Sequence, residues 1–330
     1  MDLVTLSIPV YNVEKYVERA LLSALNQTYE NIEYLIVDDK GSDNSMNIVR
    51  DIISTYPRGK TAKIVEHPIN LGLGAARNSA IEHAQGKYLF FMDSDDEITS
   101  DCIRKLYDEM EKTGVDVVCG SSCTVAENKI ISSDTKSFIE KDKMQIMLSY
   151  FNNRFSIMVW NKLYKLSFLR EKHINCVPYQ TIEDNYFSFQ ILLNIQSYSR
   201  ISDITYLFHV RNDSITGGGW NEKVFRQWTP IFSDLLESLQ KSSLDSKLRI
   251  KVKKRLFKRR WGISAMALKS PHNVQHYIND YLTPNLLKDK DTFRSVFLFL
   301  AYIFSCMPFA IKKIGLLIHM RTVNHRTHGN

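Results

Sequence analysis

Residues 3–121 alternate short apolar runs with helical patterns, and this alternation constrains the fold more than any other feature of the sequence. The apolar runs are VTLSIPV, IEYLIVDD, AKIVEH, KYLFFMD and VDVVCGS, and the stretches between them have helical spacing. Strands separated by crossover helices form a mostly parallel sheet with helices on both faces. The sequence therefore predicts an α/β fold whose ligands bind beyond the carboxyl ends of the strands.

Polar, turn-rich segments follow four of these strands: PVYN, DDKGSDNS, NLGLGAARN and DSDD. In the last segment Asp93 and Asp95 alternate along an extended chain, so both carboxylates face the same side. Hard oxygen ligands suit Mn²⁺ or Mg²⁺, and phosphate and water oxygens complete the coordination. The pair predicts a metal site that also holds a diphosphate. Asp96 and Glu97 have a simpler interpretation as acids that cap the helix starting near Thr99.

The other polar segments leave alternatives open. Asp38 or Asp39 can accept hydrogen bonds from the N–H and hydroxyl donors of a nucleoside, whereas Asp43 and Asn44 are more simply helix caps. Asn12, just after the first strand, is expected to cap the first helix.

The segment NLGLGAARN contains Gly72 and Gly74, which suggests a dinucleotide-binding site. That fingerprint needs Gly or Ala at its third position and belongs on the first strand-to-helix turn. Here the third position is Arg77, and the turn follows the third predicted strand, so we reject a nicotinamide cofactor. Arg77 instead offers a fork of donors to a base carbonyl or a phosphate.

Several ordered motifs now point to one family. They are SIPVYNVEKYVERALLSALNQTYENIEYLIVDDKGSDNS, NLGLGAARNSAIEHAQGKYLFFMDSDD, WNKLYK and IEDNYF. Together they resemble family 2 glycosyltransferases with the GT-A fold, over about residues 3–216, or two thirds of the chain. The resemblance implies an inverting transferase that uses a nucleotide-diphosphate sugar, with a UDP-sugar favoured.

The resemblance also implies roles for individual residues. It assigns the nucleotide-sugar site to Pro9, Tyr11, Glu14, Asp39, Arg77, Asp93 and Ser94. Asp95 would hold the metal on the diphosphate, and Asp184 matches the catalytic base of the family. From the residues alone, Glu183 and Asp184 are equally well explained as acids at a helix N-terminus. Lys40 departs from the family pattern, in which Gly is common at this position.

The acceptor side of the site rests on weaker motifs. Trp160 is expected to border the acceptor, although it would serve equally as a core anchor. His209 and Arg211 either contact the diphosphate or form an exposed basic pair. Residues Ser214 to Gly219 are expected to form a lid over the donor.

The charge distribution divides the chain. The formal net charge is +7, but the stretch KLRIKVKKRLFKRRWG carries much of the excess, and the chain has no acidic residue after Asp291. We expect a catalytic domain over 1–220, with nucleotide-sugar binding in 1–121 and the acceptor side in 122–220. Residues 221–330 are expected to form a basic, mainly helical extension.

The uncharged stretch 295–311, SVFLFLAYIFSCMPFAI, lies between Arg294 and the pair Lys312 and Lys313. It is at the lower length limit for crossing a bilayer, and Pro308 interrupts it. A core or dimer helix and a membrane span are the alternatives. We favour peripheral attachment to anionic lipid head groups at the membrane surface.

These observations combine into one expectation: transfer of a sugar from a nucleotide-diphosphate donor to a glycan or lipid-linked acceptor, in cell-surface polysaccharide synthesis. The alternative is a non-catalytic nucleotide-sugar binding protein of the same fold. No nucleic-acid partner is expected, because lipid head groups and solvated helix faces explain the basic stretch with fewer assumptions. Five cysteines without metal-binding spacing, and no signal peptide before the first strand, favour the cytoplasm.

Overall fold

The structure is a computed structural model. It describes residues 1–126, 129–132, 136–152, 154–177, 183–211, 222–269, 288–308 and 310–316. Within these ranges it describes every side chain except those of residues 129, 132, 222–229, 266, 267 and 269. The chain divides into two compact units, Met1–Gly217 and Gly218–Asn330. The division falls three residues before the domain boundary expected at residue 220. The assignment of donor and acceptor functions to parts of the first unit stays a prediction.

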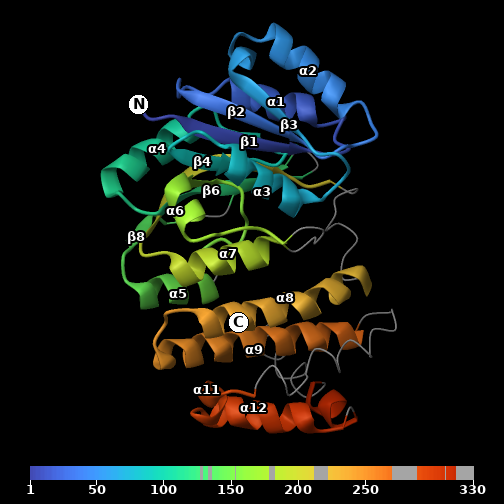
Figure 1. The fold of residues 1–330 in the computed structure, drawn as a ribbon, viewed down its shortest axis with the longest axis vertical. Coiled ribbons are helices and arrows are strands. Elements are labelled where there is room, and N and C mark those ends of the chain that lie inside the picture. Colours follow the sequence, from blue (N-terminus) through green and yellow to red (C-terminus); the bar gives the residue numbers. More distant parts are fainter. Residues whose placement is uncertain are drawn as a thin grey trace. The chain divides into compact units, whose positions relative to one another are not determined.

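One twisted sheet forms the centre of the first unit (Figure 1). Its strands are β1 (Val4–Val10), β2 (Ile32–Asp38), β3 (Ala62–Glu66), β4 (Tyr88–Phe91), β5 (Glu97–Ile98), β6 (Val117–Ala126), β7 (Lys129–Ser132), β8 (Phe138–Glu140), β9 (Lys162–Lys165) and β10 (Tyr198–His209). The strand order is β3-β2-β1-β4-β9-β6-β10-β5, with β7 on β6 and β8 on β10.

The five strands predicted from the sequence are all present and point the same way. β1 pairs in parallel with β2 and β4, and β2 pairs in parallel with β3. β9 lies between β4 and β6 and is antiparallel to both, a strand that the sequence pattern did not predict. β10, parallel to β6, extends the sheet further. The mostly parallel α/β fold is confirmed.

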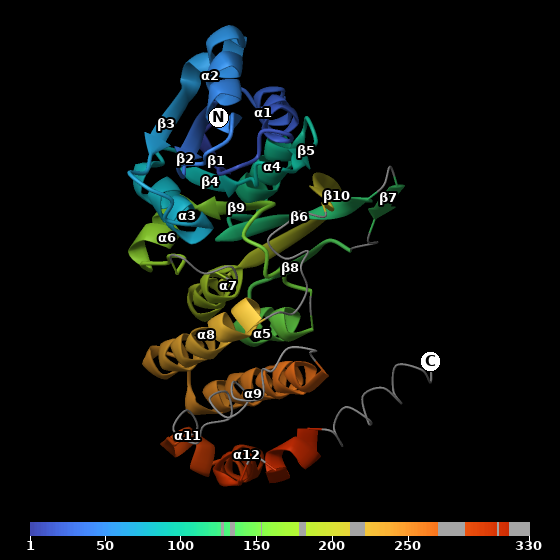
Figure 2. The same cartoon turned by 90° about the vertical axis from the view of Figure 1, so that its right-hand side faces the viewer.

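Helices cover both faces of the sheet. They are α1 (Val17–Leu25), α2 (Ser45–Thr55), α3 (Leu73–His83), α4 (Cys102–Thr113), α5 (Lys143–Phe151), α6 (Leu166–Glu171) and α7 (Glu183–Asn194), with a 3₁₀ turn η1 (Pro57–Thr61). In Figure 2, α1 and α4 lie on one side of the sheet, and α3 and α6 lie on the other. All seven residues of β1 are buried, as expected for a strand covered on both faces.

Alternate residues of the central strands build two layers of core. Leu6 and Ile8 of β1 belong to one buried apolar cluster with Leu21 of α1. On the other face Phe91, at the end of β4, packs edge-to-face on Phe187 of α7, with ring centroids 6.1 Å apart. The carboxyl end of β4 is therefore held between a core layer on each side.

The first helix begins differently from the prediction. Asn12 does not cap it: α1 starts at Val17, with Tyr16 in the capping position. Asn12 instead adopts a left-handed conformation with φ of 50° and accepts a hydrogen bond from the backbone N–H of Ser42, at 2.8 Å. Its side chain thereby ties the loop after β1 to the loop after β2.

The second unit is helical, as expected. It contains α8 (Glu222–Lys241), α9 (Ser246–Lys269), α11 (Lys290–Phe293) and α12 (Val296–Cys306). Phe257 of α9 and Ala301 of α12 form a small core with Trp261 and Tyr302. Among the described residues, no helix is long and apolar enough to cross a membrane. All five cysteines are free thiols, and Cys306 is exposed while the other four are buried.

Candidate active site

Three carboxylates converge just beyond the carboxyl end of β4. Oxygen atoms of Asp93, Asp95 and Asp96 all lie within 4.8 Å of one another. Asp96 is buried and accepts hydrogen bonds from the Tyr206 hydroxyl at 2.9 Å and from the backbone N–H of His209 at 2.8 Å. β10 thus supplies the donors that hold the buried member of the cluster in place.

The predicted capping role of Asp96 and Glu97 is wrong. Helix α4 starts at Cys102, and Asp101 occupies its N-cap position. Glu97 instead lies 2.7 Å from Nε2 of His209. The acids of this segment face β10 because the chain makes a two-residue strand, β5, before α4 begins.

Burial and mutual repulsion change the protonation of the cluster. Burial, with the nearby charges of Asp93 and Asp95, raises the pKa of Asp96 to about 8. Burial also raises the pKa of Asp93 to about 6, against the opposing effect of Arg77. At neutral pH a bound cation would therefore stabilise the form of the cluster in which all three carboxylates are ionised. An all-oxygen donor set of this kind fits Mg²⁺ or Mn²⁺.

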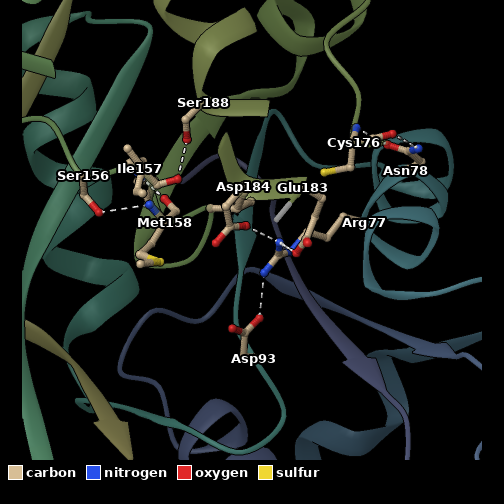
Figure 3. Close-up of polar contacts among 12 residues, drawn as sticks. Arg77, Asn78, Asp93, Ser156, Ile157, Met158, Cys176, Glu183, Asp184 and Ser188 are labelled. Carbon is tan, nitrogen blue, oxygen red and sulfur yellow. Dashed lines mark hydrogen bonds and ion pairs between the residues drawn. The ribbon is translucent and has the colours of Figure 1, made fainter. Parts of the chain in front are cut away.

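Arg77 connects this cluster to the start of α7 (Figure 3). The guanidinium is 1% exposed, and its Nη2 lies 3.1 Å from Oδ1 of Asp93. Its Nη1 donates to Glu183 at 2.8 Å and also to Asp184. One buried cation therefore holds carboxylates that lie about ninety residues apart in the sequence.

The two acids at the start of α7 differ in access. The side chain of Asp184 is 19% exposed and that of Glu183 only 5%. Burial, with the neighbouring Asp184 carboxylate, raises the pKa of Glu183 to about 7. Asp184 is thus the member of the pair that an outside molecule can reach, and Asp93, at 23% exposure, is similarly accessible.

The glycines of NLGLGAARN place α3 and the segment before α7 side by side. Gly72 has φ of 87°, a left-handed conformation that favours glycine. A Cβ on Gly74 would lie 2.4 Å from the carbonyl oxygen of Val177, so only glycine allows this approach. Asn78 and the backbone of Cys176 exchange two hydrogen bonds, of 2.7 and 2.9 Å, across the same contact (Figure 3).

Asp39, expected to contact the nucleoside, is buried at the carboxyl end of β2. Its two oxygens accept hydrogen bonds from the backbone N–H groups of Leu71 and Gly72, at 2.8 and 2.9 Å. Nδ1 of His67 lies 2.7 Å from the same carboxylate, and Nε2 of His67 lies 2.8 Å from the Ser79 hydroxyl. His67 was not predicted from the sequence, although its place directly after β3 was the available signal.

Of the remaining predicted donor-site residues, Pro9 lies near the end of β1 and the others lie on the neighbouring loops. Pro9 and Ser94 are buried, while Tyr11 is 44% exposed. Glu14 accepts from the backbone N–H of Asn44 at 3.0 Å, and the N–H of Glu14 donates to Asp43 at 2.9 Å. These contacts order the loop after β2 against the loop after β1.

Asp43 has a further local role, because its carboxylate accepts from the backbone N–H of Ser45 at 3.0 Å where α2 begins. Asn44 occupies the N-cap position of α2, but its side chain makes no capping hydrogen bond. Lys40 has φ of 54°, in the left-handed region that glycine adopts without steric cost. This conformation explains why Gly suits the position.

The acceptor-side residues gather around β10. The Trp160 ring stacks on Tyr206, with centroids 4.4 Å apart, and also on Phe208. Nε of Arg211 lies 2.6 Å from Oδ2 of Asp95. With Glu97 bound to His209 and Asp95 bound to Arg211, these two residues are not an exposed basic pair. The predicted lid from Ser214 to Gly219 lies outside the described residues.

Comparisons with known proteins identify the family of this chain. The sequence pattern of the family Glycosyl transferase family 2 matches residues 5–186, more than half of the chain. The glycosyltransferase EpsH of Bacillus subtilis (strain 168) is 31% identical over 247 residues, covering 73% of this chain and 70% of EpsH. The poly(ribitol-phosphate) beta-glucosyltransferase of Bacillus spizizenii is 27% identical, covering 76% of this chain but 38% of that relative.

Solved structures support the fold. A crystal structure of Staphylococcus aureus TarS residues 1–349 in complex with UDP-GlcNAc has a TM-score of 0.72 at 19% identity, covering 86% of this chain and 80% of that one. The family match and the structural likeness agree with the ordered motifs of the sequence. The chain therefore belongs to glycosyl transferase family 2 and has the GT-A fold.

Proposed function

We propose that the protein transfers a sugar from a nucleotide-diphosphate donor to a hydroxyl group of a glycan or lipid-linked acceptor, with inversion. The observation that carries this proposal is the shared guanidinium of Arg77, which joins the Asp93 end of the acidic cluster to Asp184. The proposed metal-diphosphate site and the proposed base therefore contact the same buried guanidinium. Electrostatic stabilisation and a positioned base are what such a transfer requires.

In the proposed reaction the acceptor oxygen attacks the anomeric carbon of the sugar, and the bond from that carbon to the diphosphate oxygen breaks. The proton of the acceptor hydroxyl passes to the carboxylate of Asp184. A base of this kind contributes about 10² to 10⁴ in rate. Because the acceptor oxygen attacks the face opposite the leaving diphosphate in a single displacement, the anomeric configuration is inverted.

Asp95, with Asp93 and Asp96, would hold Mn²⁺ or Mg²⁺, which would neutralise the charge that develops on the leaving diphosphate. Pro9, Tyr11, Glu14, Asp39 and Ser94 are proposed to line the donor site around it. Trp160, His209 and Arg211 are proposed on the acceptor or diphosphate side. We favour a UDP-sugar donor, since the structurally similar TarS was crystallised with UDP-GlcNAc.

The proposed setting is the synthesis of a cell-surface polysaccharide in the cytoplasm, at the inner face of the cell membrane. The relatives support it: one is named a poly(ribitol-phosphate) beta-glucosyltransferase. A non-catalytic nucleotide-sugar binding protein is the second candidate, since a metal held by the acidic cluster would bind a diphosphate whether or not Asp184 acts as a base.

A panel of nucleotide-sugars, titrated with and without Mn²⁺, tests the proposal. Asp95→Ala is expected to abolish the metal dependence of donor binding. Asp184→Asn is expected to keep donor binding and lower turnover by about 10² to 10⁴. Unchanged turnover in Asp184→Asn would remove the base assignment. Donor binding without turnover on any acceptor by the wild-type protein would favour the non-catalytic candidate.

The neighbouring acid provides a matched variant. Glu183 shares Arg77 with Asp184 but is 5% exposed. Glu183→Gln is therefore expected to lose far less turnover than Asp184→Asn, although both variants replace a carboxyl group by an amide beside the same guanidinium. A larger loss of turnover in Glu183→Gln than in Asp184→Asn would instead indicate Glu183 as the base.

A further inference from the structure

Helix α12 is apolar around its whole circumference, although only one side of it is buried. Leu298, Ala301 and Ser305 are buried and recur at spacings of three and four residues. An outer stripe, made up of Val296, Phe299, Leu300 and Ile303, lies on the opposite side of the helix at exposures of 78, 40, 58 and 38%. A helix at the surface of a soluble protein normally presents polar residues on that side.

The outer stripe continues beyond α12. Phe293 of α11 is 55% exposed and lies 6.0 Å, centroid to centroid, from Phe299. Past the end of α12, Ile311 and Ile314 are 47 and 58% exposed. An exposed apolar surface of this kind marks an interaction site.

Four lysines lie near α12 in space or in the sequence. This basic rim consists of Lys258, Lys288, Lys290 and Lys313. Nζ of Lys258 lies 5.6 Å from the ring centroid of Phe297 on α12, and Lys288 and Lys290 are exposed just before the helix. In the described part of the chain, no carboxylate lies within ion-pair distance of these four lysines.

The acids of the same segment point inward and are neutralised. Asp291 is buried, and its carboxylate lies 2.8 Å from Nε of Arg249. Asp289 pairs with Lys253, which is itself buried. The surface around the outer stripe is therefore cationic, and the sequence adds no acid after Asp291.

We infer that the outer stripe and basic rim dock this protein on the surface of an anionic lipid bilayer, with α12 lying flat in the head-group region. The eleven residues of α12 span only about 16 Å, against about 30 Å for a hydrocarbon core, so the helix lies on the bilayer rather than across it. Apolar side chains enter the acyl boundary and the lysines meet lipid phosphates.

A second copy of the chain fits this surface less well. A two-fold interface would place the outer stripe against itself and bring the basic rim of one copy to that of the other. Like charges at such an interface repel each other, whereas anionic lipids are attracted to every lysine of the rim. This docking inference is independent of the proposed transferase reaction.

Vesicle co-sedimentation of the full-length protein tests the inference. Vesicles of phosphatidylcholine alone are compared with vesicles of equal parts phosphatidylcholine and phosphatidylglycerol, at low and high salt. The protein is expected to bind the anionic vesicles at least about tenfold more tightly, and added salt should weaken that binding. Equal or undetectable binding to both vesicles would overturn the inference.

Two sets of variants separate the apolar and the charged contributions. Phe299→Gln with Leu300→Gln is expected to weaken binding at least about tenfold. The matched control, Ile130→Gln with Ile131→Gln, changes apolar residues on β7 that are even more exposed and should have no effect. Lys288→Glu with Lys290→Glu should weaken binding to anionic vesicles by more than about tenfold and leave neutral vesicles unaffected.

The remaining outcomes identify other occupants. Sedimentation velocity without lipid should show a monomer. A dimer that dissociates in the Phe299→Gln, Leu300→Gln variant would assign the stripe to a second copy and overturn the lipid inference. Asp184→Asn should bind vesicles as the wild type does, and the stripe variants should keep turnover on a soluble acceptor. A failure of docking is thereby distinguished from a failure of the proposed catalysis.

Discussion

Arg77 is the residue on which the candidate site depends most. The sequence indicated that its guanidinium contacts a ligand, and its carboxylate partners could not be predicted because two of them lie more than a hundred residues away. By contrast, the approach of Asp93 to Asp95 followed from their alternate spacing, whereas Asp96 joins them through its hydrogen bonds with Tyr206 and His209 and was not predicted to do so. Local spacing predicts a local cluster, whereas a long-range ion pair depends on the completed fold.

Arg77→Met should destabilise the first unit and nearly abolish turnover. The substitution leaves buried carboxylates without their cation, so we expect the free energy of unfolding to fall by about 3–5 kcal/mol. Urea unfolding and initial rates measure the two effects. The control is Arg50→Met, which removes an ion pair with Glu66 whose side chains are 45 and 48% exposed and should cost less than about 1 kcal/mol. Equal losses in both variants would contradict the role of Arg77.

Lys162 supplies a pH-dependent prediction. Burial lowers its pKa to about 8 from an ordinary value of 10.5, and its side chain is 1% exposed. Below pH 8 the folded protein bears the cost of a buried charge. Between pH 8 and 10.5 the unfolded chain binds more protons at this site, so the contribution of Lys162 to stability rises with pH in that window.

Lys162→Met should remove this contribution. The free energy of unfolding of the wild type, relative to that of the variant, is expected to increase by on the order of 3 kcal/mol between pH 7.5 and pH 10.5. Urea unfolding at the two pH values measures it, with Lys60→Met as the control at an exposed lysine. A wild-type-to-variant difference that does not change with pH would show that the buried side chain does not titrate in this range.

At the scale of elements, strands with a continuous apolar run were predictable and a strand without one was not. The five parallel strands followed from their apolar runs, and the long helices of the second unit followed from their helical spacing. β9 begins and ends with a lysine, so it shows no apolar run, and its place between β4 and β6 depends on long-range pairing. The predicted start of α1 was wrong because the Asn12 side chain accepts a hydrogen bond from the loop after β2 and not from the first turn of the helix.

The contact between α3 and the segment before α7 is the element-level feature most open to test. Gly74→Ala places a methyl group against the backbone of Val177, so we expect a loss of roughly 1–3 kcal/mol in stability together with reduced turnover. Gly262→Ala is the control, because no atom lies within 4 Å of its added Cβ. That helical substitution should stabilise the protein by about 1 kcal/mol. Similar effects of both changes would show that the contact is not tight.

For the whole molecule, the division into two units separates donor chemistry from the inferred lipid surface. The first unit contains its own apolar core and every donor-site residue proposed above. The change in charge and pattern along the sequence indicated this division, because a basic stretch without acids follows the acidic motifs. The order of strands in the sheet was beyond prediction, since it depends on which distant segments pair.

A chain ending at Gly217 should therefore fold and bind the same nucleotide-sugar. We expect its dissociation constant to stay within about threefold of the full-length value, while vesicle binding disappears. Calorimetric titration and co-sedimentation measure the two quantities. If the truncated chain binds the donor more than tenfold more weakly despite a native circular dichroism spectrum, the second unit contributes to the donor site.

The distribution of thiols provides a practical means of observing the second unit. Cys306 is exposed at the last residue of α12, and the other four cysteines are buried. A maleimide dye added to the native protein would therefore label one position without any mutagenesis. With an environment-sensitive fluorophore at that position, a blue shift of the emission on mixing with liposomes would show in real time when the end of α12 enters a less polar environment.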